Sequence, residues 1–81
     1  MPTVRTERGY RFFFYSDEGS PREPRHVHVA RGAGAAKVWL DPEPVLDRTA
    51  GLSARELQQA MRIIMDHAED FRRAWDEHFR R

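Results

Sequence analysis

The sequence lacks cysteine altogether, which excludes disulfides and thiolate metal sites from its 81 residues. It also lacks an apolar run near the ~20 residues that cross a bilayer, and no apolar leader follows Met1. We therefore expect a cytoplasmic protein with no membrane partner. A strong charge excess is missing too, since the formal net charge is +1, and this balance does not by itself call for nucleic acid. The length leaves room for one small domain of modest stability.

What the chain does contain is a series of short β-prone segments separated by turn residues. The run YRFFFY at 10–15 is the most aromatic, and HVHV at 26–29 alternates with period two. Glycine and proline punctuate the intervening stretches, including a predicted loop over 17–24. The sequence predicts an antiparallel sheet of three to four strands, drawn from residues 10–15, 26–29 and 36–40 with weaker candidates at 3–6 and 45–47.

A long amphipathic helix is predicted to follow the sheet. Ser53 and Glu56 have the spacing of a capping box, which marks a helix start. Apolar residues then recur at steps of three and four and fall on one stripe. We expect one helix over 52–81, with a break near Asp66-His67 as the alternative. The stripe comprises Leu57, Ala60, Met61, Ile64, Ala68, Phe71, Trp75 and Phe79.

These elements predict an α+β fold in which the sheet packs on the C-terminal helix. We expect a single domain over 1–81, with a β-sheet part at 1–48 and a helical part at 52–81. One helix covers only one face of a sheet, so the two faces must differ.

The register of the central hairpin follows from the requirement that its apolar side chains share a face. Val27 and Val29 enter the core together with Val38 and Leu40 if Val29 lies opposite Val38 and Val27 opposite Leu40. The turn then centres on 33–34. The opposite face of the sheet receives His26, His28, Lys37 and Trp39.

The pair His26 and His28 is the sharpest candidate site. Two residues apart on a strand, both imidazoles point the same way, with Cα atoms roughly 6.5 Å apart. This arrangement suits acid–base catalysis near neutral pH, which needs both rings accessible and a cation such as Lys37 nearby. It also suits polar recognition of a partner beside Trp39, or it is an incidental feature of a half-exposed strand. A metal site on the two histidines is a third reading that stays open, but the third ligand is missing locally, so we assign no metal and no cofactor.

The aromatic strand places rings on both faces of the sheet. One set must face the core, while Phe13 and Tyr15 lie beside Arg11 on the other side. Exposed aromatic patches on small domains mark interfaces, although such rings also stack on nucleic-acid bases. We favour a protein partner for this surface.

Several of these segments resemble the small prokaryotic proteins grouped as domain of unknown function 4160. The resemblance spans nearly the whole chain, and its most specific part is the Pro–His–apolar–His segment. Family members show two prolines before the first histidine, whereas here Pro24 is kept and Arg25 stands at the second position. The matching runs are GYRFFFYS at 9–16, HVHV at 26–29 followed by Gly32, and AKVWL at 36–40.

The resemblance implies a genetic context more than a chemistry. Members are commonly encoded beside a second small protein, of the domain-of-unknown-function 2442 type, in pairs that look like toxin–antitoxin modules. We therefore expect a component of a bacterial toxin–antitoxin-like pair that binds a small cognate protein, or else a homodimer, through the sheet face or an edge strand.

Two functional hypotheses remain open within that context. If the chain is the toxin, RNA is its expected target, with His26 and His28 as acid–base groups and with Lys37, Arg25 and Arg11 contacting phosphate. The alternative is a non-catalytic binding module, in which the aromatic strand and the sheet face dock a partner. The binding residues of that surface are Arg11, Phe13, Tyr15, Arg25 and Trp39.

Overall fold

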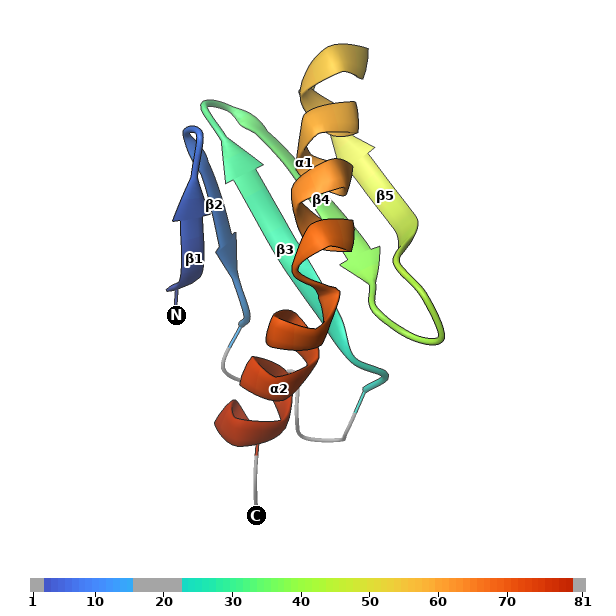
Figure 1. The fold of residues 1–81 in the computed structure, drawn as a ribbon. Helices are drawn as coiled ribbons and strands as arrows, with labels where there is room; N and C mark the ends of the chain where they lie inside the picture. Colours follow the sequence, from blue (N-terminus) through green and yellow to red (C-terminus); the bar gives the residue numbers. More distant parts are fainter. Residues whose placement is uncertain (1–2, 16–22, 80–81) are drawn as a thin grey trace.

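The computed structural model describes residues 3–15 and 23–79 and places five strands before two helices (Figure 1). The strands form one antiparallel sheet in the order β1-β2-β3-β4-β5, and both helices lie over the same face of it. The fold is therefore α+β, as predicted. The elements are β1 (Thr3–Glu7), β2 (Tyr10–Phe13), β3 (His26–Arg31), β4 (Gly34–Trp39), β5 (Val45–Ala50), α1 (Ala54–Asp66) and α2 (Ala68–His78).

The prediction of three to four strands is too low, because both weak segments join the sheet. The β1–β2 hairpin closes through Arg8 and Gly9, whose φ angles are 55° and 84°. Positive φ at both central residues is the requirement of a type I′ turn, which matches the twist of the flanking strands. At the other edge, β5 continues to Ala50, which pairs with Ala35. Of the predicted loop over 17–24, residues 17–22 lie outside the described residues.

The predicted register of the β3–β4 hairpin is wrong by two residues. Val27 lies opposite Val38, and Val29 opposite Ala36. The reason is the turn, which contains only residues 32–33 and has its glycine at a φ of 56°. Because a shift of two preserves the side-chain alternation, each residue stays on its predicted face. The prediction that the valines enter the core is therefore confirmed.

The start of α1 is the capping box that the sequence predicts. The Ser53 hydroxyl accepts the backbone N–H of Glu56 at 3.0 Å, and the Glu56 carboxylate accepts the backbone N–H of Ser53 at 2.9 Å. These bonds hold the pKa of Glu56 below its ordinary value. Leu52 and Leu57 flank the box, partly buried against the core, at the positions of a hydrophobic staple.

The prediction of one uninterrupted helix is wrong, and the break falls at His67, where the alternative placed it. His67 leaves the helical conformation, with φ −122° and ψ 23°. A straight helix through His78 would extend for about 37 Å, whereas a six-residue strand spans about 20 Å. The break lets α2 keep Phe71 5.4 Å from Phe12 and Trp75 5.3 Å from Phe14, measured between ring centroids.

The core fills the space between the helices and one face of the sheet. Aromatic residues of β2 and of the segment after it meet the aliphatic residues of β3 and β4 and the helical stripe. No helix in the described part of the chain is long and apolar enough to cross a bilayer. The buried cluster comprises Tyr10, Phe12, Phe14, Val27, Val29, Ala36, Val38, Leu40, Ala60, Ile63, Ile64, Phe71, Trp75 and Phe79.

Trp75 provides the test of this packing. We expect Trp75→Ala to lower the free energy of unfolding by ~3–5 kcal/mol, since a large buried ring leaves a cavity. Urea denaturation followed by circular dichroism measures the change. Arg73→Ala, at an exposed position on the same helix, is the matched control and should cost within about 0.5 kcal/mol. A loss below about 1 kcal/mol for Trp75→Ala would contradict the packing.

Candidate functional site

The sheet face that the helices leave uncovered brings most of the predicted site residues together. His28 lies directly opposite Phe13 on β2 and opposite Lys37 on β4. His26 lies opposite Trp39. Directly opposed residues of antiparallel strands share a face, so these five side chains belong to one side of the sheet, here called the open face, although α2 reaches the His26 ring at the end of that face.

A cluster of rings lies across the open face, with His28 at its centre. The His28 ring is stacked on Phe13 at 5.6 Å and makes edge contacts with Tyr15 at 4.5 Å and with His26 at 5.1 Å. The guanidinium of Arg11 lies 4.8 Å from the centroid of the Phe13 ring. These contacts hold His28 in place and leave it only 8% exposed.

His26 is enclosed at the beginning of β3. Its ring lies 4.9 Å from Trp75 of α2 and 5.4 Å from Trp39, and the residue is 0% exposed. Its Nδ1 is 2.9 Å from the carbonyl oxygen of Pro24. A carbonyl only accepts, so Nδ1 carries the proton and donates it. The accessibility that acid–base catalysis requires of both rings is therefore not met by His26.

Lys37 is also engaged by its neighbours. Its ammonium lies 4.4 Å from the centroid of the Trp39 ring and 3.6 Å from the carboxylate of Glu23, and its side chain is 11% exposed. A cation over an indole face and beside a carboxylate is already stabilised within the protein. It therefore offers little unpaired charge to a phosphate.

A shallow hollow of about 260 Å³ lies on the open face beside this cluster. The sequence analysis missed two of its polar residues, Arg48 and Thr49, because it ended the last strand at residue 47. Arg48 lies opposite Lys37 on β4, and its side chain is 70% exposed. One signal in the sequence favoured a longer edge strand. Thr49 is β-branched, which is typical of strands, and the first turn residue after it is Gly51. The hollow is lined by Tyr15, His28, Ala35, Ala36, Lys37, Arg48, Thr49 and Ala50.

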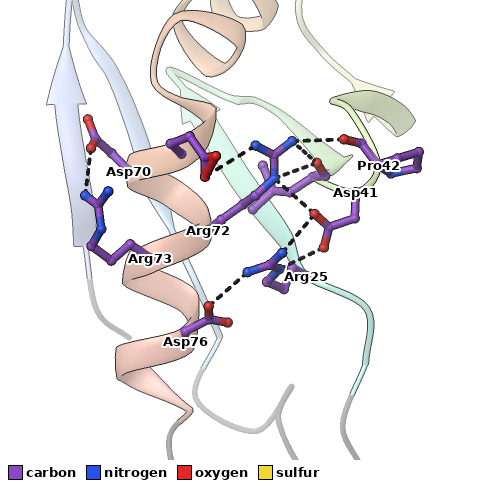
Figure 2. Close-up of polar contacts among 9 residues, drawn as sticks. Arg25, Asp41, Pro42, Asp70, Arg72, Arg73 and Asp76 are labelled. Atoms are coloured by element: carbon purple, nitrogen blue, oxygen red, sulfur yellow. Dashed lines mark hydrogen bonds and ion pairs between the residues drawn. The ribbon is translucent and has the colours of Figure 1, made fainter.

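Arg25, the remaining predicted binding residue, lies apart from this hollow in an ionic network (Figure 2). Its guanidinium donates to both carboxylate oxygens of Asp41, at 2.8 and 3.1 Å, and to Asp76 at 2.9 Å. The bidentate pairing is the geometry in which arginine binds carboxylates best. Two internal carboxylates thus occupy the group that the sequence analysis assigned to phosphate.

Arg72 extends the same network from α2 to the end of β4 (Figure 2). It donates to the carbonyl oxygens of Leu40 at 2.6 Å and Pro42 at 3.2 Å, and to the carboxylate of Asp41 at 3.0 Å. The hydrogen bond from Arg25 is the largest influence that holds the pKa of Asp41 below its ordinary value, and partial burial opposes it. Asp41 is thus the carboxylate shared by both arginines, and it joins α2 to the sheet.

Side chains that could bind a metal ion are spread over the described residues. Among them, no three histidine, aspartate or glutamate side chains gather closely enough to hold an ion. The carboxylates of Asp41 and Asp76 form ion pairs with arginines.

Asp41→Asn tests the network through its pH dependence. Because the pKa of Asp41 is lower in the folded protein than its ordinary value of 3.8, its charge stabilises the fold above that pH. The stabilisation is lost as the pH falls through the folded pKa. We expect urea melts to show Asp41→Asn less stable than the wild type at pH 6, and the gap to close as the pH falls below about 3.8.

Asp70→Asn is the matched control for that series. Asp70 is an exposed carboxylate of α2 that pairs with Arg73 at 3.2 Å, and surface pairs of this kind contribute within about 0.5 kcal/mol. A gap between wild type and Asp41→Asn that stays constant from pH 6 to pH 2.5 would contradict the assigned role of the carboxylate.

Comparison with known proteins identifies a family but no characterised relative. No curated protein and no solved structure matches the sequence. Residues 9–76 match the family described as domain of unknown function DUF4160. This match begins at the β1–β2 turn and extends into α2, so it includes the open face and both arginines of the ionic network. The chain belongs to the DUF4160 family, as its sequence motifs indicate.

Proposed function

We propose that this protein is the binding component of a bacterial toxin–antitoxin-like pair and holds a small cognate protein on its open face. The observation that carries the proposal is the position of its exposed apolar side chains. Tyr15 is 44% exposed at the hollow, and Val45 is 52% exposed on β5. Val45 lies opposite Trp39, so it belongs to the same face. An exposed aromatic side chain at a hollow, with a further exposed apolar side chain on the same sheet face, is typical of a protein interface.

The charges and the edge of this face define the partner that suits it. Arg11 and Arg48 give the face positive charge, although Asp47 pairs with Arg48 and partly offsets it. A partner with apolar and acidic side chains complements this surface. Strand β5 is the last in the sheet order, so its outer edge is available for pairing with a strand of the partner. A second copy of this chain is the alternative occupant of that edge.

RNA cleavage is the weaker hypothesis because the groups that it needs are engaged elsewhere. His26 is enclosed beside Trp75, and Lys37 and Arg25 face carboxylates. The binding proposal uses these residues as packing and leaves the exposed side chains to recognise the partner. We also propose that the protein is located in the cytoplasm, where its proposed partner is made.

The proposal is tested by measuring how variants of the open face bind the protein encoded beside this one. We expect Tyr15→Ala and Val45→Glu each to weaken binding by about tenfold or more, because each removes an exposed apolar side chain from the open face. Isothermal titration calorimetry with the purified neighbour measures the affinity. Met65→Ala is the matched control, since Met65 is 54% exposed on α1 and should change the affinity less than about twofold.

Two further measurements can contradict the proposal: the state of assembly of the mixed proteins and an RNA cleavage assay. Sedimentation of the mixed proteins should show a complex, and two monomers that ignore each other would contradict the proposal. Incubation of the chain alone with a mixed-sequence RNA should leave the RNA intact. Cleavage that persists in EDTA and is lost in His28→Ala would instead establish the catalytic hypothesis.

A further inference from the structure

A second surface lies on the helix side of the molecule, between α1 and the β1–β2 turn. It is a groove with a volume of about 480 Å³, and polar side chains supply most of its lining. Three arginines from two distant parts of the sequence meet there, so it is here called the arginine groove. Its lining residues are Glu7, Arg8, Arg55, Gln58, Gln59, Arg62, Ile63 and Asp66.

The arginines of this groove differ from the others in the described part of the chain. Elsewhere a guanidinium contacts a carboxylate or stacks on a ring. Within the described residues, Arg8, Arg55 and Arg62 have no ion pair, side-chain hydrogen bond or ring contact, and all three are exposed. The engaged arginines are Arg5 with Glu7, Arg11 with Phe13, Arg25 with Asp41, Arg31 with Glu56, Arg48 with Asp47, Arg72 with Asp41 and Arg73 with Asp70.

The carboxylates of the groove do not neutralise these guanidiniums. Glu7 is already held by Arg5 at 2.8 Å and faces His67 at 3.6 Å. Asp66 lies one helical turn after Arg62 without forming an ion pair with it. The groove therefore keeps an excess of positive charge although the whole protein carries only +1.

The position of Arg55 adds a second observation. It lies in the first turn of α1, where the helix dipole disfavours a cation. Among the described residues no carboxylate forms an ion pair with Arg55, because Glu56 of the same turn faces Ser53 and Arg31, so an anion brought by a ligand would relieve this cost. Arg55 and Arg62 are seven residues apart, which places them on one helix face at a separation of about 10 Å. A single carboxylate cannot span that distance, whereas a peptide with several acidic residues can.

We propose that the arginine groove binds an acidic peptide segment of a partner protein. Guanidinium forks bind carboxylates with two parallel hydrogen bonds, and the side chain of Gln58 lies between the arginines to hydrogen-bond the peptide backbone. A single-stranded nucleic acid fits less well, because no aromatic ring lines the groove for base stacking. The proposal does not depend on the open face, which lies on the other side of the sheet.

Fluorescence anisotropy with labelled hexaglutamate at low ionic strength tests the proposal. We expect the wild-type protein to bind this probe, and Arg55→Gln and Arg62→Gln each to weaken binding by about fivefold or more. Glutamine keeps the helix propensity and removes only the charge. Arg73→Gln is the matched control, because it makes the same change in net charge at an exposed position of α2. It should alter the affinity less than about twofold.

Three results would overturn the proposal. The first is the absence of probe binding by the folded wild-type protein at millimolar concentration. The second is an equal loss of affinity in Arg73→Gln, which would indicate general charge attraction. The third is tighter binding of a single-stranded oligouridylate that depends on Arg55 and Arg62, which would assign the groove to nucleic acid.

Discussion

Alternation of side chains along five antiparallel strands is the constraint on which the rest of this structure depends. Each strand sends every second residue to the helices and the others to the opposite face. Val27, Val29 and Val38 therefore enter the core, and the residues between them form the open face. Because α1 and α2 both lie over one face, the other must be stabilised by its own contacts. The rings stacked around His28 provide them.

The contacts that hold α2 against the sheet engage several of the side chains that the sequence suggested for catalysis or phosphate binding. Arg25 and Arg72 hold Asp41 between α2 and the end of β4, and Trp75 covers the ring of His26. The residue types that suggest phosphate chemistry in the sequence thus serve the packing of the domain. Acid–base catalysis requires a group that its substrate can reach, and the ring of His26 is fully buried.

Two surfaces are left with groups that the fold itself does not use. The open face carries exposed apolar side chains around a shallow hollow, and the arginine groove carries guanidiniums without carboxylate partners. They lie on opposite sides of the sheet, so one partner could occupy one without blocking the other.

Features that depend on neighbouring residues could be predicted from the sequence. The capping box at Ser53 and the face of each valine follow from local spacing, and the family follows from motifs that run through most of the chain. The motif around His26 and His28 correctly indicated one face of a strand. These properties are set within a few residues, where the pattern of side chains and backbone hydrogen bonds is sufficient.

Features that depend on contacts between distant segments could not be predicted in this way. The two-residue turn after Arg31 set the hairpin register, since a shift of two residues satisfies the same alternation. Contacts between segments 49 to 51 residues apart enclosed His26 and paired Arg25 with Asp76. They also brought Arg8 next to the helix that carries Arg55 and Arg62. No local sequence pattern predicts these contacts, because they form only when the helices pack on the sheet and bring distant side chains together.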